Sequence, residues 1–250
     1  MDSIQNFTGR ATDYTVGRPV YALRFIEHLY SHYGFSEQSL VADIGAGTGK
    51  FTKQLLDRGS HVYCVEPNDD MREIAVKELR GYKKFTAIKG TATDTSLADH
   101  SVDFITTAQA FHWFDVAGFR NECKRILKEN GYVFLIWNMR DMTSEITLEC
   151  FEIYSKYCPN FKGFGGGIQK DDVRIKRFFD NNYTYVEFDN DLYYTKDTFI
   201  SRSLSGSYSL KDGDEKYDEY LGEIEKVFEK YALDGNLTMK NKTVAYIGMI

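Results

Sequence analysis

The first 140 residues alternate short apolar runs with segments whose apolar positions recur at helical spacing. The runs that predict strands are Leu40–Ile44, His61–Glu66, Phe85–Ile88, Val102–Thr106 and Tyr132–Trp137. The segments that predict helices are Val20–Tyr33, Lys50–Arg58, the run that contains Met71 and Leu79, and about Val116–Leu127. Nearly continuous apolar strands that alternate with helices are typical of a parallel sheet with helices on both faces. The pattern therefore predicts a doubly wound α/β fold.

Beyond Asn138 this alternation stops. Strand-like runs remain at about 183–189 and at 243–250, and the second of these would close the sheet. The segments of helical spacing are 144–157, 195–204 and 214–231, and the glycine-rich segment 161–167 between them predicts a flexible loop. Because these helices have no place in the strand–helix alternation, we expect them to form a helical cap over the rim of the sheet.

The composition allows one domain and argues against several classes of partner. With 250 residues, of which 42% are hydrophobic, the chain can bury one large core. The net charge of −6 argues against a nucleic-acid partner, which calls for a basic face. The four cysteines form no CxxC pair, which favours a reducing cytoplasm and no structural zinc. No apolar stretch approaches the ~18 residues of a membrane span, so we expect no membrane partner.

The glycine-rich turn after the first strand is the clearest candidate for ligand binding. Asp43 ends the strand, Gly45, Gly47 and Gly49 alternate with small residues, and a helical pattern begins at Lys50. Glycine lets backbone N–H groups approach a ligand closely at the start of a helix. A dinucleotide site has the spacing GxGxxG, and a triphosphate-binding loop has GxxxxGK followed by Ser or Thr. This turn fits neither pattern.

Other candidate residues stand at the ends of predicted strands. Glu66 ends the second strand, Thr93 follows the third, and Gln109–Trp113 follow the fourth. Ligands of doubly wound sheets bind outside the carboxyl ends of the strands, where the strand order reverses, so we expect one site there. Glu66 stands 17 residues past Gly49, close to the spacing of about 20 residues of a ribose-binding carboxylate.

Two stretches carry a resemblance to a known family. DIGAGTG, from Asp43 to Gly49, resembles the first motif of class I S-adenosylmethionine-dependent methyltransferases. SVDFITTAQAFHWFD, from Ser101 to Asp115, and the amino-terminal Tyr14 resemble the small-molecule methyltransferases related to trans-aconitate methyltransferase, the type 11 group. The resemblance implies a mostly parallel, seven-stranded sheet with an antiparallel last strand. It also implies S-adenosylmethionine as the cofactor and transfer of its methyl group by in-line displacement.

The resemblance assigns roles to individual residues. Asp43, Gly45 and Gly47 would hold the amino-acid part of the cofactor. Glu66 would accept hydrogen bonds from both ribose hydroxyls, and Met71 would pack against the adenine. The cofactor contacts expected in full are Tyr14, Arg18, Asp43, Gly45, Ala46, Gly47, Glu66, Pro67, Met71, Ala92, Thr93, Gln109, Ala110 and Phe111.

The candidate residues for acceptor chemistry are fewer. His112, at the end of the fourth strand, is the best placed general base, with packing beside Trp113 as the alternative. Trp113, Arg140 and Tyr208 are the candidate substrate contacts.

Two further positions leave alternatives open. Thr93 stands where many relatives have a carboxylate, so Asp94 or a backbone carbonyl is the alternative partner of the adenine amino group. His28 and His32 lie one helical turn apart, which favours a solvated helix face over a metal site. We therefore expect no bound metal.

The expected function is methylation of a small-molecule substrate, with oxygen or nitrogen favoured over carbon as the accepting atom. The alternatives are a cofactor-binding regulatory protein of the same fold without turnover, and a methyltransferase that acts on a peptide or a sugar. We expect a cytoplasmic monomer or homodimer. The single methyltransferase domain 1–250 would divide into an N-terminal lid and helix (1–35), a cofactor-binding core (36–139), cap insertions (140–242) and a closing strand (243–250).

Overall fold

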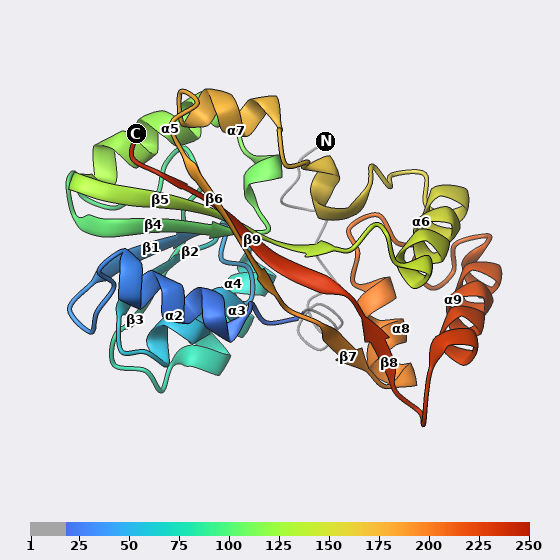
Figure 1. Cartoon of the computed structure of the whole chain (residues 1–250). Helices are drawn as coiled ribbons and strands as arrows, with labels where there is room; N and C mark the ends of the chain where they lie inside the picture. The colour runs from blue at the N-terminus through green and yellow to red at the C-terminus, as the bar shows by residue number, and fades with distance from the viewer. Residues whose placement is uncertain (1–18) are drawn as a thin grey trace.

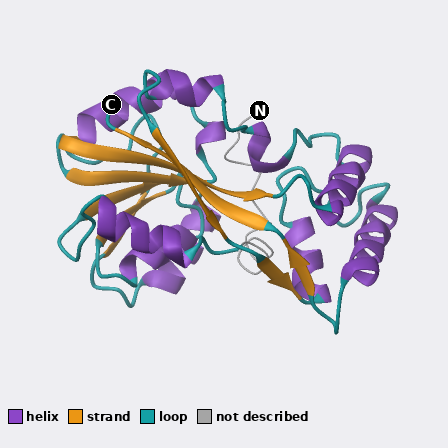
Figure 2. Cartoon of the chain, in the orientation of Figure 1, coloured by secondary structure: helices purple, strands orange, loops and turns teal. Residues whose placement is uncertain are grey.

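The computed structural model describes residues 19–250, and it shows a twisted sheet with helices on both faces beside a smaller cap (Figures 1 and 2). Two of the expected cofactor contacts, Tyr14 and Arg18, lie outside the described residues. The strands of the large sheet are β1 (Leu40–Ile44), β2 (His61–Val65), β3 (Phe85–Ile88), β4 (Val102–Ala108), β5 (Leu127–Arg140), β6 (Thr184–Asp189) and β9 (Asn241–Gly248).

The seven strands lie in the order β3–β2–β1–β4–β5–β9–β6. β1 pairs in parallel with both β2 and β4, so the order of the strands along the chain reverses at β1. β9 lies between β5 and β6 and is antiparallel to both. The predicted doubly wound, mostly parallel sheet with an antiparallel last strand is confirmed. Its topology places a ligand crevice outside the carboxyl ends of β1 and β4.

Helices cover the two faces of this sheet. They are α2 (Leu23–His32), α3 (Lys50–Leu56), α4 (Asp69–Leu79), α5 (Val116–Ile126) and α7 (Val173–Phe178), and a short 3-10 helix, η2 (Phe111–Trp113), follows β4. On β5, Phe134 and Ile136 pack with α2 and α3. Leu135 and Trp137 point to the opposite face and pack with α5 and α7. Both faces of the strands are therefore buried, which explains their continuous apolar sequence.

The cap has a hydrophobic core of its own. Its elements are α6 (Glu145–Tyr157), η3 (Phe164–Gly167), β7 (Leu192–Tyr194), α8 (Lys196–Leu204), α9 (Tyr217–Tyr231) and β8 (Leu237–Met239). The three predicted cap helices are confirmed as α6, α8 and α9. The antiparallel pair of β7 with β8 was not predicted, because each strand has only three residues. Helix α7 was not predicted either, and it packs on the sheet although it lies within the predicted cap range.

Two long strands connect the sheet with the cap (Figure 1). The ladder between β5 and β9 extends from Val133, paired with Gly248, to Arg140, paired with Asn241. Trp137 is buried in the core of the sheet, and Arg140 contacts aromatic side chains of the cap three residues later. A single strand thus carries side chains to both parts of the molecule.

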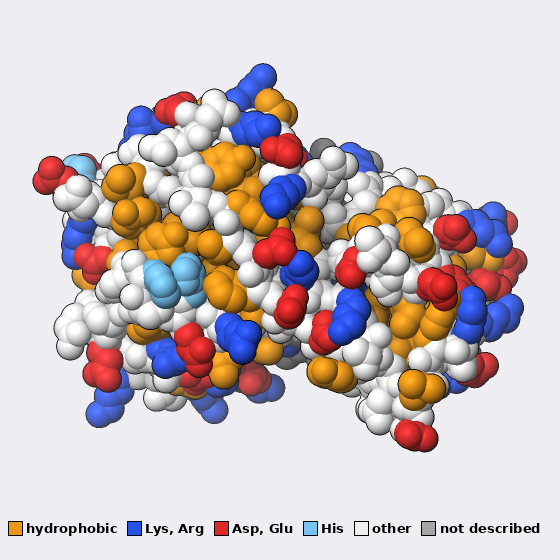
Figure 3. All heavy atoms as spheres, viewed as in Figure 1, with side chains coloured by type: hydrophobic (Ala, Val, Ile, Leu, Met, Phe, Trp, Pro, Cys, Tyr) orange, Lys and Arg blue, Asp and Glu red, His pale blue; other side chains and the backbone are white. Residues whose placement is uncertain are grey.

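The surface shown in Figure 3 carries Lys and Arg side chains interspersed with Asp and Glu side chains. The rings of His28 and His32 lie 4.2 Å apart on α2, and the ring of His28 also packs on Phe188. Within residues 19–250, no three His, Cys, Asp or Glu side chains gather as metal ligands. No helix in this part of the chain is long and apolar enough to cross a membrane.

Candidate functional site

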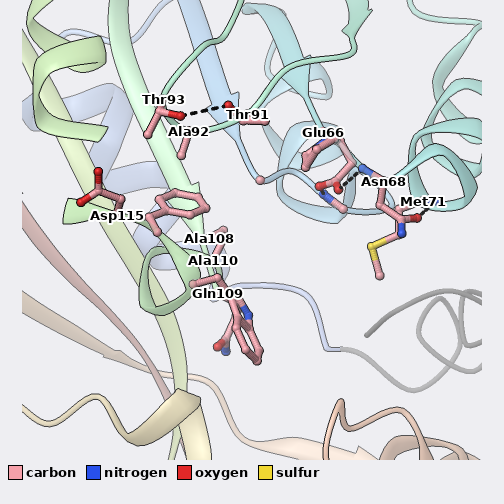
Figure 4. A pocket seen from close by; sticks show the side chains of 15 residues that line it. Glu66, Asn68, Met71, Thr91, Ala92, Thr93, Ala108, Gln109, Ala110 and Asp115 are labelled. Atoms are coloured by element: carbon pink, nitrogen blue, oxygen red, sulfur yellow. Dashed lines mark hydrogen bonds between the residues drawn. The ribbon is translucent and has the colours of Figure 1, made fainter. Parts of the chain in front are cut away.

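A cavity of about 270 Å³ lies at the carboxyl ends of β1, β2 and β4 (Figure 4). The predicted site residues that line it are Gly45, Gly47, Glu66, Pro67, Met71, Ala92, Thr93, Gln109, Ala110 and Trp113. The lining residues that were not predicted are Asn68, Thr91, Ala108, Phe114 and Asp115. The structure therefore brings the separate strand-end segments of the sequence to one cavity.

The carboxylate of Glu66 holds the glycine turn against the start of α4. Its Oε2 accepts a hydrogen bond from the N–H of Gly47 at 2.8 Å, and its Oε1 accepts one from the N–H of Asn68 at 2.9 Å. Burial raises the pKa of Glu66, while these two donors act in the opposite direction. A carboxylate has about four acceptor positions, so Glu66 can still accept hydrogen bonds from a diol in the cavity.

The glycine turn needs its glycines for steric reasons. Gly45 has φ +70°, and a Cβ at this position would lie 2.6 Å from Cβ of Ala110 and 3.0 Å from the Phe114 ring. A Cβ on Gly49 would lie 2.6 Å from Leu79 of α4. The turn thus passes close to the segment after β4 and close to α4, and its backbone forms one wall of the cavity.

Asp43 lies behind the glycine turn and outside the cavity. Its side chain is fully buried. Its Oδ2 accepts a hydrogen bond from the hydroxyl of Thr52 at 2.6 Å, and its Oδ1 accepts one from the hydroxyl of Thr106 at 2.9 Å. Burial raises the pKa of Asp43 to about 6, although the hydroxyl donors oppose the rise. Asp43 therefore ties β1 to α3 and β4 beneath the turn, and its contact with a cofactor stays a prediction.

The start of α4 forms the wall next to Glu66. The side chain of Asn68 caps the helix, because its Oδ1 accepts a hydrogen bond from the N–H of Met71 at 3.0 Å. This cap fixes the first turn of α4, from which Met71 lines the cavity. Figure 4 shows Glu66, Asn68 and Met71 together on one side of the cavity.

The opposite side of the cavity carries Thr91, Thr93 and Asp115 (Figure 4). The two threonine hydroxyls lie 3.3 Å apart. Asp115 caps α5, since its carboxylate accepts hydrogen bonds from the N–H groups of Ala117 and Gly118. Asp94, the predicted alternative to Thr93, does not line the cavity; its carboxylate accepts a hydrogen bond from the N–H of Ser96 at 3.3 Å. Asp115 is therefore the carboxylate that the structure places at this end.

Gln109 connects the cavity with a second, smaller hollow. It has φ +58°, which is strained for a residue with a side chain. Its N–H donates to the carbonyl of Ile136, and its Nε2 donates to the carbonyl of Asn138 at 3.0 Å. The second hollow shares Ala108 and Gln109 with the first and is also lined by Pro19, Tyr21, Ala46, Thr48, Lys50, Phe51, Asn138 and Arg202. Predicted Ala46 is thus found here, and Arg202 brings a cation from cap helix α8.

Phe111 was expected at the cofactor, but the structure places it in the hydrophobic core. Its side chain is 1% exposed and does not line the cavity. The ring packs edge-on against Phe178 of α7 and Trp137 of β5. The physical reason is the tight turn of η2, which directs the Phe111 ring toward α5 and α7 while Ala110 and Trp113 face the cavity.

His112 lies on η2 beside Trp113, with their ring centroids 4.9 Å apart. It is half-buried and does not line the first cavity, whereas Trp113 does. The glycine segment η3 of the cap covers its ring, because a Cβ on Gly166 would lie 2.1 Å from Cδ2 of His112. Its expected role as a general base stays a prediction, and its packing beside Trp113 is observed.

Arg140 and Tyr208 lie in the cap, away from the first cavity. The guanidinium of Arg140 lies 4.2 Å from the ring centroid of Phe164 and 5.8 Å from that of Tyr154. Its Nη1 is buried and, within residues 19–250, has no hydrogen-bond partner. Tyr208 packs on Tyr154 and on Phe161. Arg140 is thus a cation held between aromatic rings of the cap.

Some site residues gave a signal in the sequence and others gave none. Asp115 ends the stretch that carried the resemblance, and Asn68 follows the Glu66–Pro67 pair. Arg202 lies on a helix far along the chain, and only the folded cap brings it to Gln109. Its position could not be read from a local pattern.

The sheet topology, the glycine turn after β1 and the carboxylate at the end of β2 define a class of protein. The chain has the fold of the class I S-adenosylmethionine-dependent methyltransferases. Its residues 42–135 match the model of a family described as a methyltransferase domain.

Similar proteins support this assignment. The chain is 36% identical over 140 residues to an uncharacterized methyltransferase of Mycobacterium tuberculosis, a match that covers 56% of this chain and 55% of that protein. It thus spans little more than half the length of this relative. It is 26% identical over 245 residues to an uncharacterized methyltransferase-like protein of Schizosaccharomyces pombe, which covers 97% of this chain and 94% of that protein.

Solved structures share the fold along almost the whole chain. A protein of Anabaena variabilis assigned to the methyltransferases of antibiotic biosynthesis is 19% identical, with a TM-score of 0.66, over 94% of this chain and 99% of that one. A protein of Anaeromyxobacter dehalogenans assigned to the type II methyltransferases is 17% identical, with a TM-score of 0.62, over 92% of this chain and 97% of that one. The likeness therefore includes the cap region and not the core alone.

Proposed function

We propose that the protein transfers a methyl group from S-adenosylmethionine to an oxygen or nitrogen atom of a small acceptor that carries negative charge. The observation that carries the proposal is Arg140, a cation of the cap whose buried Nη1 has no hydrogen-bond partner in the described part of the chain. A buried charge without a partner is costly, and an anionic group of the acceptor would relieve that cost.

The first cavity is the proposed cofactor site, and its residues fit this group. The Glu66 carboxylate has acceptor positions left for a ribose diol, and the glycine turn leaves no room for a Cβ at Gly45. Met71 offers an apolar surface to the adenine, with Thr93 and Asp115 on the opposite side of the cavity. When bound, S-adenosylmethionine supplies an activated methyl group.

The acceptor would lie on the cap side of Gln109. The second hollow leads from Gln109 to Arg202, and the positive charges of Arg202 and Arg140 both act on the thiol of Cys150. Two guanidinium groups thus lie within electrostatic reach of Cys150 in the cap. Trp113, which is 39% exposed at the first cavity, would form part of the wall between donor and acceptor. The chain's contribution is to orient the two reactants, a contribution of roughly 7–11 kcal/mol in well-aligned pairs.

The test is methyl transfer by the purified full chain from labelled S-adenosylmethionine. Four pools would be offered separately: small carboxylic acids, uncharged small molecules, peptides and sugars. We expect labelled product from the acids, detected by mass spectrometry. Tight cofactor binding in calorimetry with no labelled product from any pool would instead indicate a regulatory protein without turnover. Transfer to peptides or sugars in preference to acids would contradict the proposed acceptor class.

A further inference from the structure

The glycine-rich segment η3 contacts two of the candidate acceptor-site residues at once. Phe164, its first residue, stacks on the guanidinium of Arg140 at 4.2 Å. Gly166, two residues later, lies against His112 so closely that a Cβ would be 2.1 Å from Cδ2 and 2.7 Å from Nε2 of the ring. The segment therefore joins a cation of the cap to an imidazole of the core.

Backbone geometry makes this short connection possible. Gly165, Gly166 and Gly167 have φ values of +64°, +69° and +75°, a left-handed run that only glycine adopts at low cost. Gly165 passes over the strand that connects core and cap, since its Cβ would lie 3.1 Å from Sδ of Met139 and 3.7 Å from Trp137. The three glycines allow the backbone of η3 to contact both β5 and η2.

The cap fixes the other end of the segment. The Phe164 ring packs on Phe151, Tyr154 and Phe161, with ring centroids 5.3–5.9 Å apart. A ring with this many aromatic neighbours has little freedom to move, and it holds the guanidinium from one side while Tyr154 contacts it from another. A displacement of Phe164 would therefore move Arg140 and, through the glycines, release His112.

We propose that η3 is the specificity-determining segment of the acceptor site, because it fixes the spacing between the Arg140 guanidinium and the His112 imidazole. This inference rests on the proposed function, in which Arg140 binds an anionic group of the acceptor. Acceptors whose anionic group and methyl-accepting atom match that spacing are favoured. Phe164 and Gly166 are positioning residues, since each acts through a neighbour.

The first experiment measures how well η3 shields the His112 ring from a reagent in solution, and it needs no substrate. The full chain is treated with diethyl pyrocarbonate, and carbethoxylation of the peptide that contains His112 is followed by mass spectrometry. Gly166→Ala should raise the rate of modification by roughly three- to tenfold, because the displaced ring loses its glycine cover. Gly235→Ala is the matched control: Gly235 has φ +74°, close to that of Gly166, and its Cβ would meet no atom within 4 Å. It should leave the rate unchanged.

Phe164→Ala tests whether η3 couples the position of Arg140 to that of His112. Phe164 stacks on Arg140, yet its loss should also raise the His112 rate by roughly three- to tenfold, and Phe164→Tyr should restore it. Thermal melting of each variant shows whether the chain is folded. If His112 is modified at the wild-type rate in Phe164→Ala, or if Gly166→Ala behaves like Gly235→Ala, the segment does not couple the two residues and the inference is wrong.

The second experiment measures selection among acceptors. Saturated α,ω-dicarboxylates from malonate to suberate, which carry one carboxylate for Arg140 and a second to accept the methyl group, are compared by kcat/KM with labelled S-adenosylmethionine. The wild-type chain should prefer a narrow range of lengths, and Gly166→Ala and Phe164→Ala should flatten that preference with unchanged cofactor affinity. An identical length profile in wild type and variants would overturn the inference. If acids are refused and a neutral compound is methylated, the acceptor class in the proposed function fails, while the His112 rates still decide the coupling.

Discussion

The core and the cap treat their buried charges differently. In the core, both oxygens of the Glu66 carboxylate and both oxygens of the Asp43 carboxylate accept hydrogen bonds from nearby backbone or hydroxyl groups. In the cap, Arg140 contacts aromatic rings and leaves Nη1 without a hydrogen bond in the part of the chain that the structure describes. The core charges help to hold the glycine turn in place. The Nη1 of Arg140 contributes no such bond among the described residues, so we expect this atom to bind an anionic molecule.

The largest expected effect separates stability from activity at Arg140. Arg140→Met removes a buried, incompletely paired charge, so the free energy of unfolding should stay within about 1 kcal/mol or increase. Methyl transfer to the acid pool should fall by roughly 10²–10³-fold, because an anionic acceptor loses its partner. The control is Arg125→Met, whose guanidinium pairs with Glu122 at 2.7 Å and with Asp99. This variant should lose stability and keep its activity.

Both quantities are read from chemical denaturation and from label transfer. If Arg140→Met is destabilised as strongly as Arg125→Met while methyl transfer is retained, the proposed difference between the charges of the core and the cap is wrong. Arg140 would then be a packing residue.

The next effect belongs to the core. Glu66→Ala removes a charged acceptor of the cavity and the bridge between Gly47 and Asn68. Affinity for S-adenosylmethionine, measured by calorimetry, should fall by about 10–100-fold, which corresponds to the loss of a hydrogen bond to a charged group. Asp69→Ala, at the first residue of α4 and paired with Lys89 on the surface, should bind as the wild type does. Equal affinity of Glu66→Ala and the wild type would refute the cofactor assignment.

The pH dependence of stability provides a third test. The pKa of Asp43 is about 6 in the folded chain and about 3.8 as a reference value, so the folded state binds more protons between these two pH values. Asp43 alone therefore makes the protein less stable as the pH rises from about 4 to 6, by an amount on the order of 1–3 kcal/mol. Asp43→Asn should flatten this part of the curve in denaturant titrations at each pH. A curve unchanged by the substitution would show that Asp43 does not titrate there.

The smallest effect concerns the far end of the cavity. Thr93→Val removes a hydroxyl that faces the cavity and is paired only weakly, with Thr91 at 3.3 Å. Affinity for S-adenosylmethionine should fall by about two- to tenfold, which corresponds to the loss of one neutral hydrogen bond. Asp115→Asn tests the carboxylate at the same end, and a larger loss there would make Asp115 the residue that recognises the adenine.

The core could be predicted well from sequence because its signals are local. A buried parallel strand, a glycine turn and a following helix occupy consecutive residues, so Val41–Phe51 predicts both the fold and a cavity wall. Glu66 and Gln109 were found by their positions at strand ends. The antiparallel last strand came from the family resemblance, and the place of β9 between β5 and β6 was not predicted, since no local pattern specifies it.

The cap and the direction of single side chains were harder to predict. Phe111 lies within a stretch that faces the cavity, yet the 3-10 turn sends its ring into the core. Strands β7 and β8 have three residues each, too few for a period of two to be visible. Segment 161–167 was expected to be a flexible loop, and it contains the 3-10 helix η3. The narrower resemblance to the trans-aconitate methyltransferase group stays a prediction.

The unbroken ladder of β5 and β9 has a consequence for how the molecule unfolds. A cap on flexible linkers can melt while its core stays intact. Here the hydrogen bonds that hold Arg140 beside Asn241 continue the same ladder that holds Phe134 beside Ile247. The cap and the sheet should therefore unfold in one cooperative transition, and amide exchange at Arg140 should be as slow as amide exchange at Phe134.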